Sequence, residues 1–290
     1  MPPDKGQGFR ELAYDIKEML ALGGVRTASD RPEQAFGQPC LPALGPLGAS
    51  DSMVFGEHHP WGPPAACKII ETVKILAIKQ HMNLYRQTRK FAWQVSMLGL
   101  DCGPHVTRYY MYNRFKMLGQ TLQLEPGRVL SISHSDKLAS LLGVKASEVV
   151  LADYPEHNLL SLSFPDCHFD YVLSDQVLEH VEGDPHRAVS ECHRVLRPGG
   201  ISILTTCFIN PIHACPKDFW RFTPDALSLL HQDWSEIIEV GGWGNFATWS
   251  LVQDGLRFTG VPNAKWHPLH KIAMHNDPLW PIVTWIIARK

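Results

Sequence analysis

The sequence predicts an α/β protein with a mainly parallel sheet between helical layers. Two observations predict this class. Residues 169–208 have the pattern of a strand, a helix and a second strand, with signals at each boundary. From residue 127 onward, short apolar runs of strand length alternate with helical segments. Because a helix that joins two such runs crosses over between parallel strands, the pattern indicates a layered sheet.

The segment 169–208 carries its own start and stop signals. Residues 169–174 form a short apolar run, and Asp184 can cap a helix whose first residue is Pro185. The Pro-Gly-Gly sequence at residues 198–200 ends that helix before the next apolar run. Helical spacing gives this helix one apolar face that can cover a sheet, formed by Ala188, Val189, Cys192, Val195 and Leu196.

The first 122 residues are organised differently. We expect helices over residues 8–23, 65–99 and 106–118, and an irregular arm rich in Pro and Gly over residues 25–64. The sequence therefore predicts an N-terminal helical extension over residues 1–122, which can serve as a lid. The α/β domain is expected over residues 123–290.

The other elements of the α/β domain follow in order. Strands are expected at residues 128–133, 148–153, 158–164, 169–174, 237–240 and 281–288, with one more run that ends at residue 208. Helices are expected at residues 136–143 and 223–230, besides the one that begins at Pro185. The connection after residue 153 is too short for a crossover helix.

The composition is that of an ordinary soluble protein, with 44% hydrophobic and 19% charged residues among 290. The apolar stretches are shorter than the roughly 20 residues of a membrane span. The start, MPPDKGQGFRELAYD, lacks the basic and apolar regions of a secretory signal. We therefore expect no transmembrane segment and a cytoplasmic location. The seven scattered cysteines form no C-x-x-C pair and the fifteen histidines fit no metal motif, so neither disulfides nor a metal site are expected.

Charge is distributed unevenly around a net charge of −2. Residues 64–120 contain nine basic side chains and two acidic ones: Lys68, Lys74, Lys79, Arg86, Arg89, Lys90, Arg108, Arg114 and Lys116 against Glu71 and Asp101. The simplest interpretation is a basic layer that packs against an acidic body. The alternatives are attraction to an anionic substrate, a phosphorylated carrier or an anionic membrane surface. No aromatic-basic motif accompanies the charge, so no nucleic-acid partner is expected.

Polar side chains are concentrated in the loops after two predicted strands. Ligands of parallel α/β sheets bind at the carboxyl ends of the strands, where both loops begin. The first loop contains Asp175, Gln176, Glu179 and His180, and the second contains Asn210, His213, Asp218, Trp220 and Arg221. Both loops can therefore hold a polar ligand.

The sequences LSFPDCHFDYVLSDQVLEHV and HRVLRPGGISI, with DFWRFTPDAL after them, resemble the pattern of class I S-adenosylmethionine-dependent methyltransferases of the type 11-like group. The resemblance covers about residues 126–240. It implies a Rossmann-like, seven-stranded sheet whose last strand is antiparallel, and the run at residues 281–288 suits that strand. It also implies S-adenosylmethionine as the cofactor, bound over the ends of the first, second and fourth strands.

Carried over to this chain, the family pattern assigns residues to the cofactor. Ser133, His134 and Ser135 stand in the loop that wraps the methionine part, and Asp153 stands where the family has the acid for the ribose hydroxyls. Asp175 and Gln176 would flank the sulfonium, and Asn158 falls near an adenine-contacting position.

The first loop departs from the family because it has no glycine before Gly143. Family members usually have glycines there, since the turn needs positive φ or close approach to the cofactor. Two interpretations follow. The small serines can leave room for the cofactor and hydrogen-bond its carboxylate. Alternatively, the pocket is closed and the domain has lost its cofactor. We favour binding because Asp153 is present.

Methyl transfer from a sulfonium depends mostly on alignment, and a general base is needed only when the acceptor must lose a proton. The loop after the fifth strand faces the methyl group in the family fold. We therefore expect His213 as the base, Asp218 to orient its ring, and Arg221 to clamp an acidic acceptor. The alternatives are that His213 only fixes the loop, and that Asp218 and Arg221 only pair with each other.

The sequence thus predicts a methyltransferase that acts on a small-molecule or glycan-type acceptor, with oxygen favoured as the acceptor atom. The alternative from another class is an inactive methyltransferase-like module that binds a partner through its basic helical segment. A nicotinamide-dependent oxidoreductase is disfavoured because the first loop lacks the glycine fingerprint of a pyrophosphate site.

Overall fold

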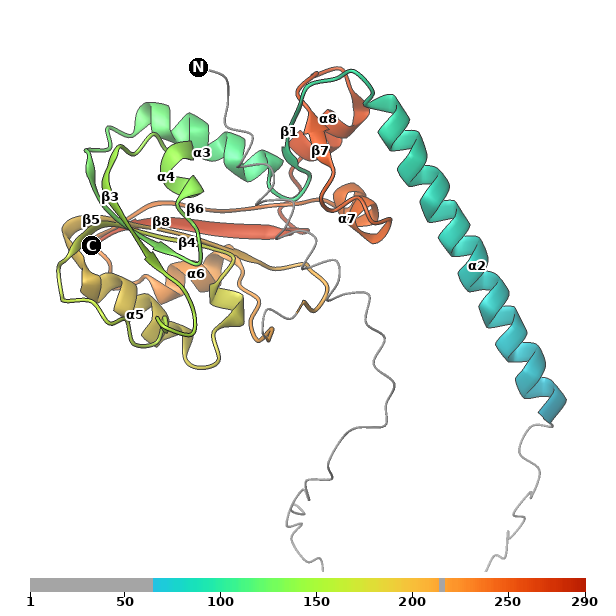
Figure 1. Cartoon of the computed structure of the whole chain (residues 1–290), viewed down its shortest axis with the longest axis horizontal. Coiled ribbons are helices and arrows are strands. Elements are labelled where there is room, and N and C mark those ends of the chain that lie inside the picture. Colours follow the sequence, from blue (N-terminus) through green and yellow to red (C-terminus); the bar gives the residue numbers. More distant parts are fainter. Residues whose placement is uncertain (1–64, 214–216) are drawn as a thin grey trace, which may run out of the picture. The chain divides into compact units, whose positions relative to one another are not determined.

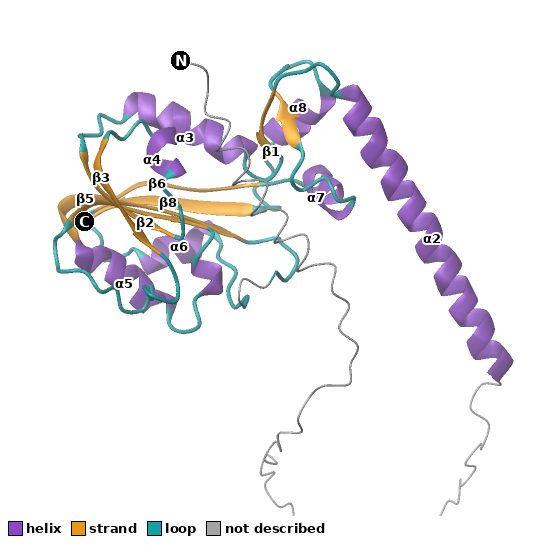
Figure 2. Ribbon diagram, in the orientation of Figure 1, coloured by secondary structure: helices purple, strands orange, loops and turns teal. Residues whose placement is uncertain are grey.

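The computed structural model describes residues 65–213 and 217–290, so the helix expected at residues 8–23 and the arm at 25–64 lie outside the described residues. In the described part, six strands form one mixed sheet in the order β3-β2-β4-β5-β8-β6 (Figures 1 and 2). The strands are β2 (Gly127–Ile132), β3 (Ala146–Ala152), β4 (Phe169–Asp175), β5 (Leu196–Cys207), β6 (Glu236–Trp243) and β8 (Val283–Arg289). β2 to β5 are parallel, whereas β8 is antiparallel to both its neighbours. The predicted α/β class and the antiparallel last strand are confirmed.

One predicted strand is not part of this sheet. Residues 158–164 form only an isolated bridge between Asn158 and Ser161. The reason is local, because the Asn158 side-chain oxygen accepts a hydrogen bond from the Leu160 N–H at 2.9 Å and so closes a turn. The sheet of the described residues therefore has six strands instead of seven, and β3 forms its edge.

Helices cover both faces of the sheet (Figure 1). They are α3 (Tyr109–Thr121) and α4 (Lys137–Leu141) on one face, and α5 (Pro185–Val195) and α6 (Pro224–Leu230) on the other. Successive strand residues point to opposite faces, so Val129 joins the core under α3 and α4 while Leu130 joins the core under α5 and α6. Two apolar cores result, and Phe115 of α3 and Val195 of α5 are fully buried in them.

The capping residues predicted from the sequence cap their helices in the structure. The Asp184 carboxylate accepts a hydrogen bond from the His186 N–H at 2.9 Å, and Pro185 is the first residue of α5. The Thr223 hydroxyl accepts one from the Ala226 N–H at 3.1 Å at the start of α6. These caps satisfy N–H groups that a helix leaves open at its start, which fixes where each helix begins.

A small substructure beside the main sheet was not predicted. Strand β1 (Cys102–His105) pairs antiparallel with β7 (Gly260–Pro262), and α7 (Phe246–Gln253) and α8 (Pro268–Met274) pack next to them. Its core contains Val106, Tyr109, Leu251, Leu256, Val261, Leu269 and Ala273. The substructure is formed by segments more than 130 residues apart in sequence, so no local pattern predicts it.

The chain divides into two compact units, residues 1–80 and 81–290. The long helix α2 (Ala65–Ser96) crosses this boundary. β1 and α3, which lie within the predicted extension 1–122, belong to the second unit together with the sheet. None of the helices in the described residues is long and apolar enough to cross a membrane.

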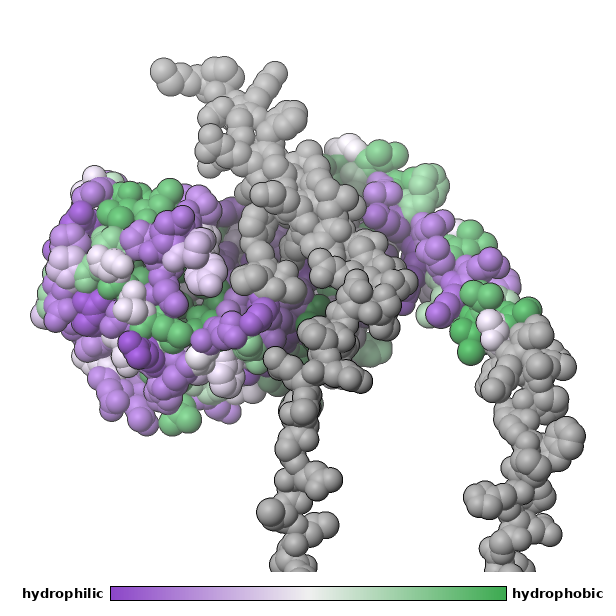
Figure 3. Space-filling model, turned by 60° about the horizontal axis from the view of Figure 1, so that its bottom comes forward, coloured by the Kyte–Doolittle hydropathy of each residue, from purple (hydrophilic) through white to green (hydrophobic). Residues whose placement is uncertain are grey.

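Part of the basic segment pairs with the acidic body. Arg89 of α2 lies 2.7 Å from a carboxylate oxygen of Asp254, and Arg114 of α3 makes two contacts with Glu239, at 2.6 and 2.9 Å. Elsewhere, the surface of α2 is mixed, with polar and apolar residues interspersed along it (Figure 3). The interpretation that the basic segment packs against an acidic body therefore applies to Arg89 and Arg114.

Candidate functional site

The carboxyl ends of β2, β3, β4 and β5 lie along one edge of the sheet, and the predicted site residues follow these ends. In the turn after β2, two residues with side chains have positive φ: Ser133 at 50° and His134 at 59°. This left-handed conformation costs an L-residue of the order of 1 kcal/mol. The turn therefore keeps a backbone that favours glycine although it contains none.

Ser135 connects this turn to the neighbouring strand. Its hydroxyl donates a hydrogen bond to the Ile132 carbonyl and accepts one from the Asp175 N–H at 2.7 Å. The side chain is buried, whereas Ser133 and His134 are exposed. Of the three residues predicted in this loop, Ser135 thus shapes the turn, and the other two face solvent.

Asp153 follows β3 directly, at the position of the predicted acid. Its Oδ2 lies 3.2 Å from Nε2 of His134. Its Oδ1 is buried and has no hydrogen-bond partner among the described residues. Because a buried carboxylate oxygen without a donor is unfavourable, this atom suits a hydroxyl group supplied by a ligand.

The turn after Asp153 separates it from Asn158. The His157 N–H donates to the Asp153 carbonyl at 2.9 Å, and the His157 ring stacks on Phe164 with ring centres 4.9 Å apart. Asn158 is exposed, and its side-chain oxygen is used in its own turn. His157 was not among the predicted residues, although it belongs to the same turn.

Asp175 and Gln176, at the end of β4, are linked through Thr205 of β5. The Gln176 amide donates to the Thr205 hydroxyl at 3.1 Å, and that hydroxyl donates to the Asp175 carboxylate. Gln176 also has positive φ, at 59°. Both predicted residues are therefore held rigidly, and the carboxylate of Asp175 is used within the protein.

Two residues that precede the sheet in sequence complete this network. The Tyr112 hydroxyl donates to Asp175 Oδ2 at 3.0 Å, and Nε of Arg108 lies 3.7 Å from Oδ1. Burial raises the pKa of Tyr112, and the Asp175 carboxylate raises it further. Burial opposes the charge of Arg108, but Asp175, Tyr112 and Glu179 together outweigh it and raise the pKa of the guanidinium. The positive charge of Arg108 thus lies at the carboxyl end of β4. The sequence indicated only that Arg108 belongs to a basic segment.

Glu179 lies in the short 3₁₀ helix η1 (Leu178–His180), directly after the end of β4. Its side chain is fully buried, and Oε2 accepts a hydrogen bond from the Thr206 hydroxyl at 2.8 Å. Burial raises the pKa of this carboxyl group. Oε1 has no hydrogen-bond partner in the described part of the chain.

The loop after β5 brings the three predicted catalytic residues together. Asp218 Oδ2 accepts a hydrogen bond from the His213 N–H at 2.8 Å and lies 3.3 Å from Nδ1 of the ring. Both Nη atoms of Arg221 donate to the two oxygens of Asp218. Burial alone would raise the pKa of Asp218, but the hydrogen bonds from Arg221 and His213 lower it to about 2. The guanidinium of Arg221 is therefore committed to Asp218.

His213 is buried, and burial lowers its pKa below the ordinary value. The neighbouring His180 and Arg257 act in the same direction, whereas Asp218 opposes them. The ring lies edge-on to that of His180, with centres 4.8 Å apart. The loops after β4 and β5 therefore meet at this pair of histidines.

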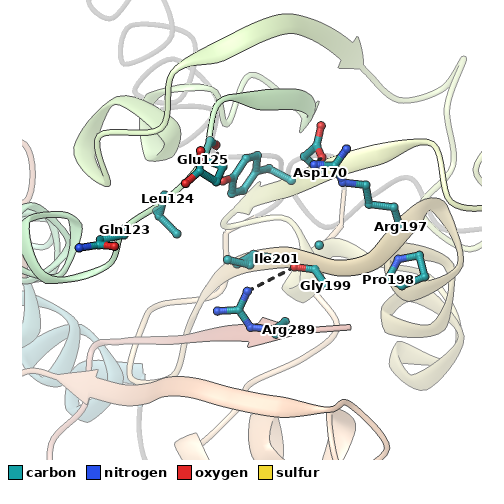
Figure 4. Close-up of a pocket in the computed structure, with 11 residues that line it drawn as sticks. Gln123, Leu124, Glu125, Asp170, Arg197, Pro198, Gly199, Ile201 and Arg289 are labelled. Atoms are coloured by element: carbon teal, nitrogen blue, oxygen red, sulfur yellow. Dashed lines mark hydrogen bonds and ion pairs between the residues drawn. The ribbon is translucent and has the colours of Figure 1, made fainter.

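A separate shallow pocket lies at the opposite end of the strands (Figure 4). It is lined by Asp170 and Tyr171 at the start of β4 and by residues 197–201 at the start of β5. Arg289 reaches across it and donates to the Gly199 carbonyl at 3.4 Å. The predicted site residues are absent from its lining, so this pocket is distinct from the site at the carboxyl edge.

Residues 116–204 match the family model of a methyltransferase domain. The matched stretch includes β2, β3, β4, the positive-φ turn and the segment around Glu179. The match covers 89 of the 290 residues, and this stretch is similar to methyltransferase domains. S-adenosylmethionine is the cofactor that this similarity indicates.

Similar proteins cover this domain to different extents. A curated protein of Mycolicibacterium smegmatis, named as a probable S-adenosylmethionine-dependent methyltransferase, is 35% identical over 79 residues, which are 27% of this chain and 29% of that protein. An uncharacterized methyltransferase of Schizosaccharomyces pombe is 26% identical over 163 residues, 56% of this chain and 52% of that protein. The chain thus spans about a third to a half of the length of these relatives.

Among solved structures, a 1,6-didemethyltoxoflavin N1-methyltransferase of Burkholderia thailandensis is 14% identical, with a TM-score of 0.41. The alignment covers 81% of this chain and 93% of that chain. That protein was solved with 1,6-didemethyltoxoflavin and S-adenosylhomocysteine bound.

The residues at the sheet edge of the methyltransferase domain fit the family cofactor. Ser133 and His134 adopt the positive-φ backbone that glycine favours, and the buried Oδ1 of Asp153 has no donor among the described residues. The backbone of Ser133 and His134 and the carboxylate of Asp153 would hold the cofactor. The side chains of Ser135 and Asp175 are occupied by protein contacts, so they would position the site instead of contacting the cofactor.

Proposed function

We propose that the protein transfers a methyl group from S-adenosylmethionine to an oxygen atom of a small-molecule or glycan-type acceptor. The observation that carries this proposal is the combination of the positive-φ turn at Ser133 and His134 with the unpartnered Oδ1 of Asp153. The cofactor, when bound, supplies a methyl group that is already activated toward nucleophiles. The protein then has to bind, align and deprotonate.

The first turn and Asp153 would bind the cofactor. The Asp153 carboxylate can accept hydrogen bonds from vicinal hydroxyls, and Oδ1 would gain a partner that the described residues do not offer it. The contact from His134 to Oδ2 is not an obstacle, because the His134 side chain is 71% exposed and can turn into solvent. The strained backbone of the turn is consistent with a conformation retained for ligand binding.

His213 would take the proton from a hydroxyl acceptor. Its lowered pKa keeps the ring neutral at neutral pH, so the ring can accept a proton. The Asp218 carboxylate, near Nδ1, orients the ring and favours the cation that proton uptake would create. Arg221 is held by Asp218, so we propose that it positions this carboxylate instead of clamping the acceptor. A base at this place supports oxygen as the acceptor atom.

An acceptor screen that measures S-adenosylhomocysteine release tests the proposal. We expect product release with one class of hydroxyl-bearing acceptors and none with Asp153→Ala. His213→Ala should lower turnover at neutral pH without weakening S-adenosylhomocysteine binding. Turnover and a pH profile identical to wild type in His213→Ala would contradict the assignment of the base.

The second candidate is an inactive methyltransferase-like module that binds a partner through basic residues of the helical segment. It is favoured by the protein contacts that occupy Ser135 and Asp175. Calorimetry with S-adenosylhomocysteine separates the two candidates, because the module is expected to give no heat at any reachable concentration. Micromolar binding that depends on Asp153 supports the enzyme.

A further inference from the structure

Glu179, His180 and His213 form a cluster whose composition is that of a metal site. One possible ligand atom of each residue lies within 4.8 Å of those of the other two. In the described ranges, 65–213 and 217–290, this is the one group of three or more His, Cys, Asp or Glu side chains with such spacing. The cluster joins the loops after β4 and β5, which explains why no spacing motif in the sequence indicates it.

The two histidines are oriented in the way that metal ligands usually are. Nδ1 of His180 lies 2.6 Å from the Lys217 carbonyl oxygen. Since a carbonyl oxygen only accepts hydrogen bonds, Nδ1 carries the proton, and the lone pair of the neutral ring is on Nε2. A ligating histidine typically donates its other ring N–H to a carbonyl or a carboxylate in this manner, which fixes its tautomer.

His213 has the same arrangement on the other side of the cluster. Its Nδ1 lies 3.2 Å from the Pro211 carbonyl oxygen and 3.3 Å from Asp218 Oδ2. Both oxygens favour a proton on Nδ1 and therefore a lone pair on Nε2. The Asn210 amide is 3.0 Å from the same nitrogen, and it can present its oxygen to the N–H after a simple flip.

Glu179 supplies the independent observation that points to a ligand. Its side chain is fully buried, and Oε1 has no hydrogen-bond partner among the described residues. A buried carboxylate is retained in proteins when a cation or several donors compensate its charge. The Thr206 hydroxyl donates to Oε2, so among the described residues Oε1 is the oxygen that has capacity for one more strong partner.

Although the sequence alone indicates no metal site, we propose that Glu179, His180 and His213 bind one divalent transition-metal ion. Two imidazoles and one carboxylate suit Zn²⁺, Fe²⁺, Mn²⁺ or Co²⁺, whereas Mg²⁺ and Ca²⁺ prefer sites made of oxygen ligands alone. With bonds of about 2.0–2.1 Å, tetrahedral ligands lie roughly 3.3 Å from one another, so small side-chain rotations would close the cluster around the ion. Three protein ligands leave a coordination position open, as catalytic sites do.

The role of the ion in turnover rests on the proposed function. A hydroxyl acceptor that occupied the open position would lose its proton to solvent water more easily, because the cation lowers the pKa of the hydroxyl. A histidine whose Nε2 holds the ion cannot also take that proton. Metal binding by this cluster would therefore replace the general-base role of His213 with a ligand role.

Metal titration of the whole chain tests this proposal without any acceptor. Protein treated with a chelator and then freed of it would be titrated with Zn²⁺ by calorimetry and with Co²⁺ by visible absorption. We expect one ion at this site, with the d–d bands of four- or five-coordinate Co²⁺. Glu179→Gln and His213→Gln should each weaken binding by at least about 100-fold, because loss of a neighbour of a ligand already costs about 10- to 100-fold. His186→Gln, on the exposed face of α5, is the matched control and should bind as wild type does.

Two results of the titration would count against the metal site. Absence of Zn²⁺ and Co²⁺ binding by the wild-type chain, or equal binding by wild type and both ligand variants, overturns the proposal. S-adenosylhomocysteine binding, measured on the same variants, shows whether they are folded and should be unchanged. A chain that binds the metal but not S-adenosylhomocysteine would refute the proposed methyl transfer and leave the metal site standing.

Discussion

The clearest test of the cofactor site is the substitution of Asp153 by asparagine. Asparagine keeps the shape of the side chain but replaces one carboxylate oxygen with an amide NH₂ group, which cannot accept a hydrogen bond. Among the described residues, Oδ1 is buried without a hydrogen-bond partner, and Oδ2 lies 3.2 Å from Nε2 of His134. The variant should therefore lose at least one hydrogen bond to a ligand hydroxyl while the fold remains intact.

The size of the loss follows from the charge on the acceptor. A hydrogen bond to a charged group contributes about 1.5–3 kcal/mol, which corresponds to about a 10- to 150-fold increase in Kd. Asp153→Ala, which removes both oxygens, should cost at least as much. His134→Ala, by contrast, removes a competing contact and should leave the affinity unchanged or raise it.

Calorimetry with S-adenosylhomocysteine measures these changes directly. Glu156→Gln is the control, because Glu156 is an exposed carboxylate in the same turn and loses the same charge. It should change Kd by less than about twofold, since exposed charges interact weakly. If Asp153→Asn binds as tightly as this control, Asp153 does not hold the ribose, and the argument from its unpartnered oxygen is wrong.

Three further predictions concern stability. Ser133→Gly should raise the free energy of unfolding by about 0.5–1 kcal/mol, because the residue has positive φ; an unchanged or lower Tm would contradict this. Burial lowers the pKa of His231 from 6.5 to about 4. Between these pH values His231 is protonated in the unfolded chain but neutral in the folded chain. Stability should therefore be full above about pH 6.5 and fall by about 2–3 kcal/mol toward pH 4, and urea denaturation of His231→Gln should lack this part of the pH dependence. Phe115→Ala should cost about 3–5 kcal/mol because the ring is fully buried, and thermal unfolding that matches wild type would refute the packing of α3 on the sheet.

Local signals in the sequence predicted much of the main sheet. The α5 boundaries follow from Asp184 and Pro185, and the α6 start follows from Thr223, because each signal acts on N–H groups two or three residues away. The strand expected at residues 158–164 was wrong because the Asn158 side chain forms a turn there. The pairing of β1 with β7 was missed because it joins segments that only the tertiary fold brings together.

The candidate site was predictable only in part, for a similar reason. The sequence placed His213, Asp218 and Arg221 in one loop, and the structure brings their side chains into contact. It did not show that Arg108 and Tyr112 reach Asp175, since these contacts cross from a helix to the end of a strand. The meeting of His180 with His213 depends on the parallel neighbours β4 and β5, and chain order alone does not reveal it.

The edge position of β3 has a consequence for handling the protein. Within the described residues, β3 hydrogen-bonds to β2 alone, and Val149 and Leu151 are 44% and 46% exposed on it. A strand with one open row of backbone groups and apolar side chains is a template for a strand from a second molecule. Concentrated samples should therefore associate through β3, and a lysine in place of Val149 should keep them apart.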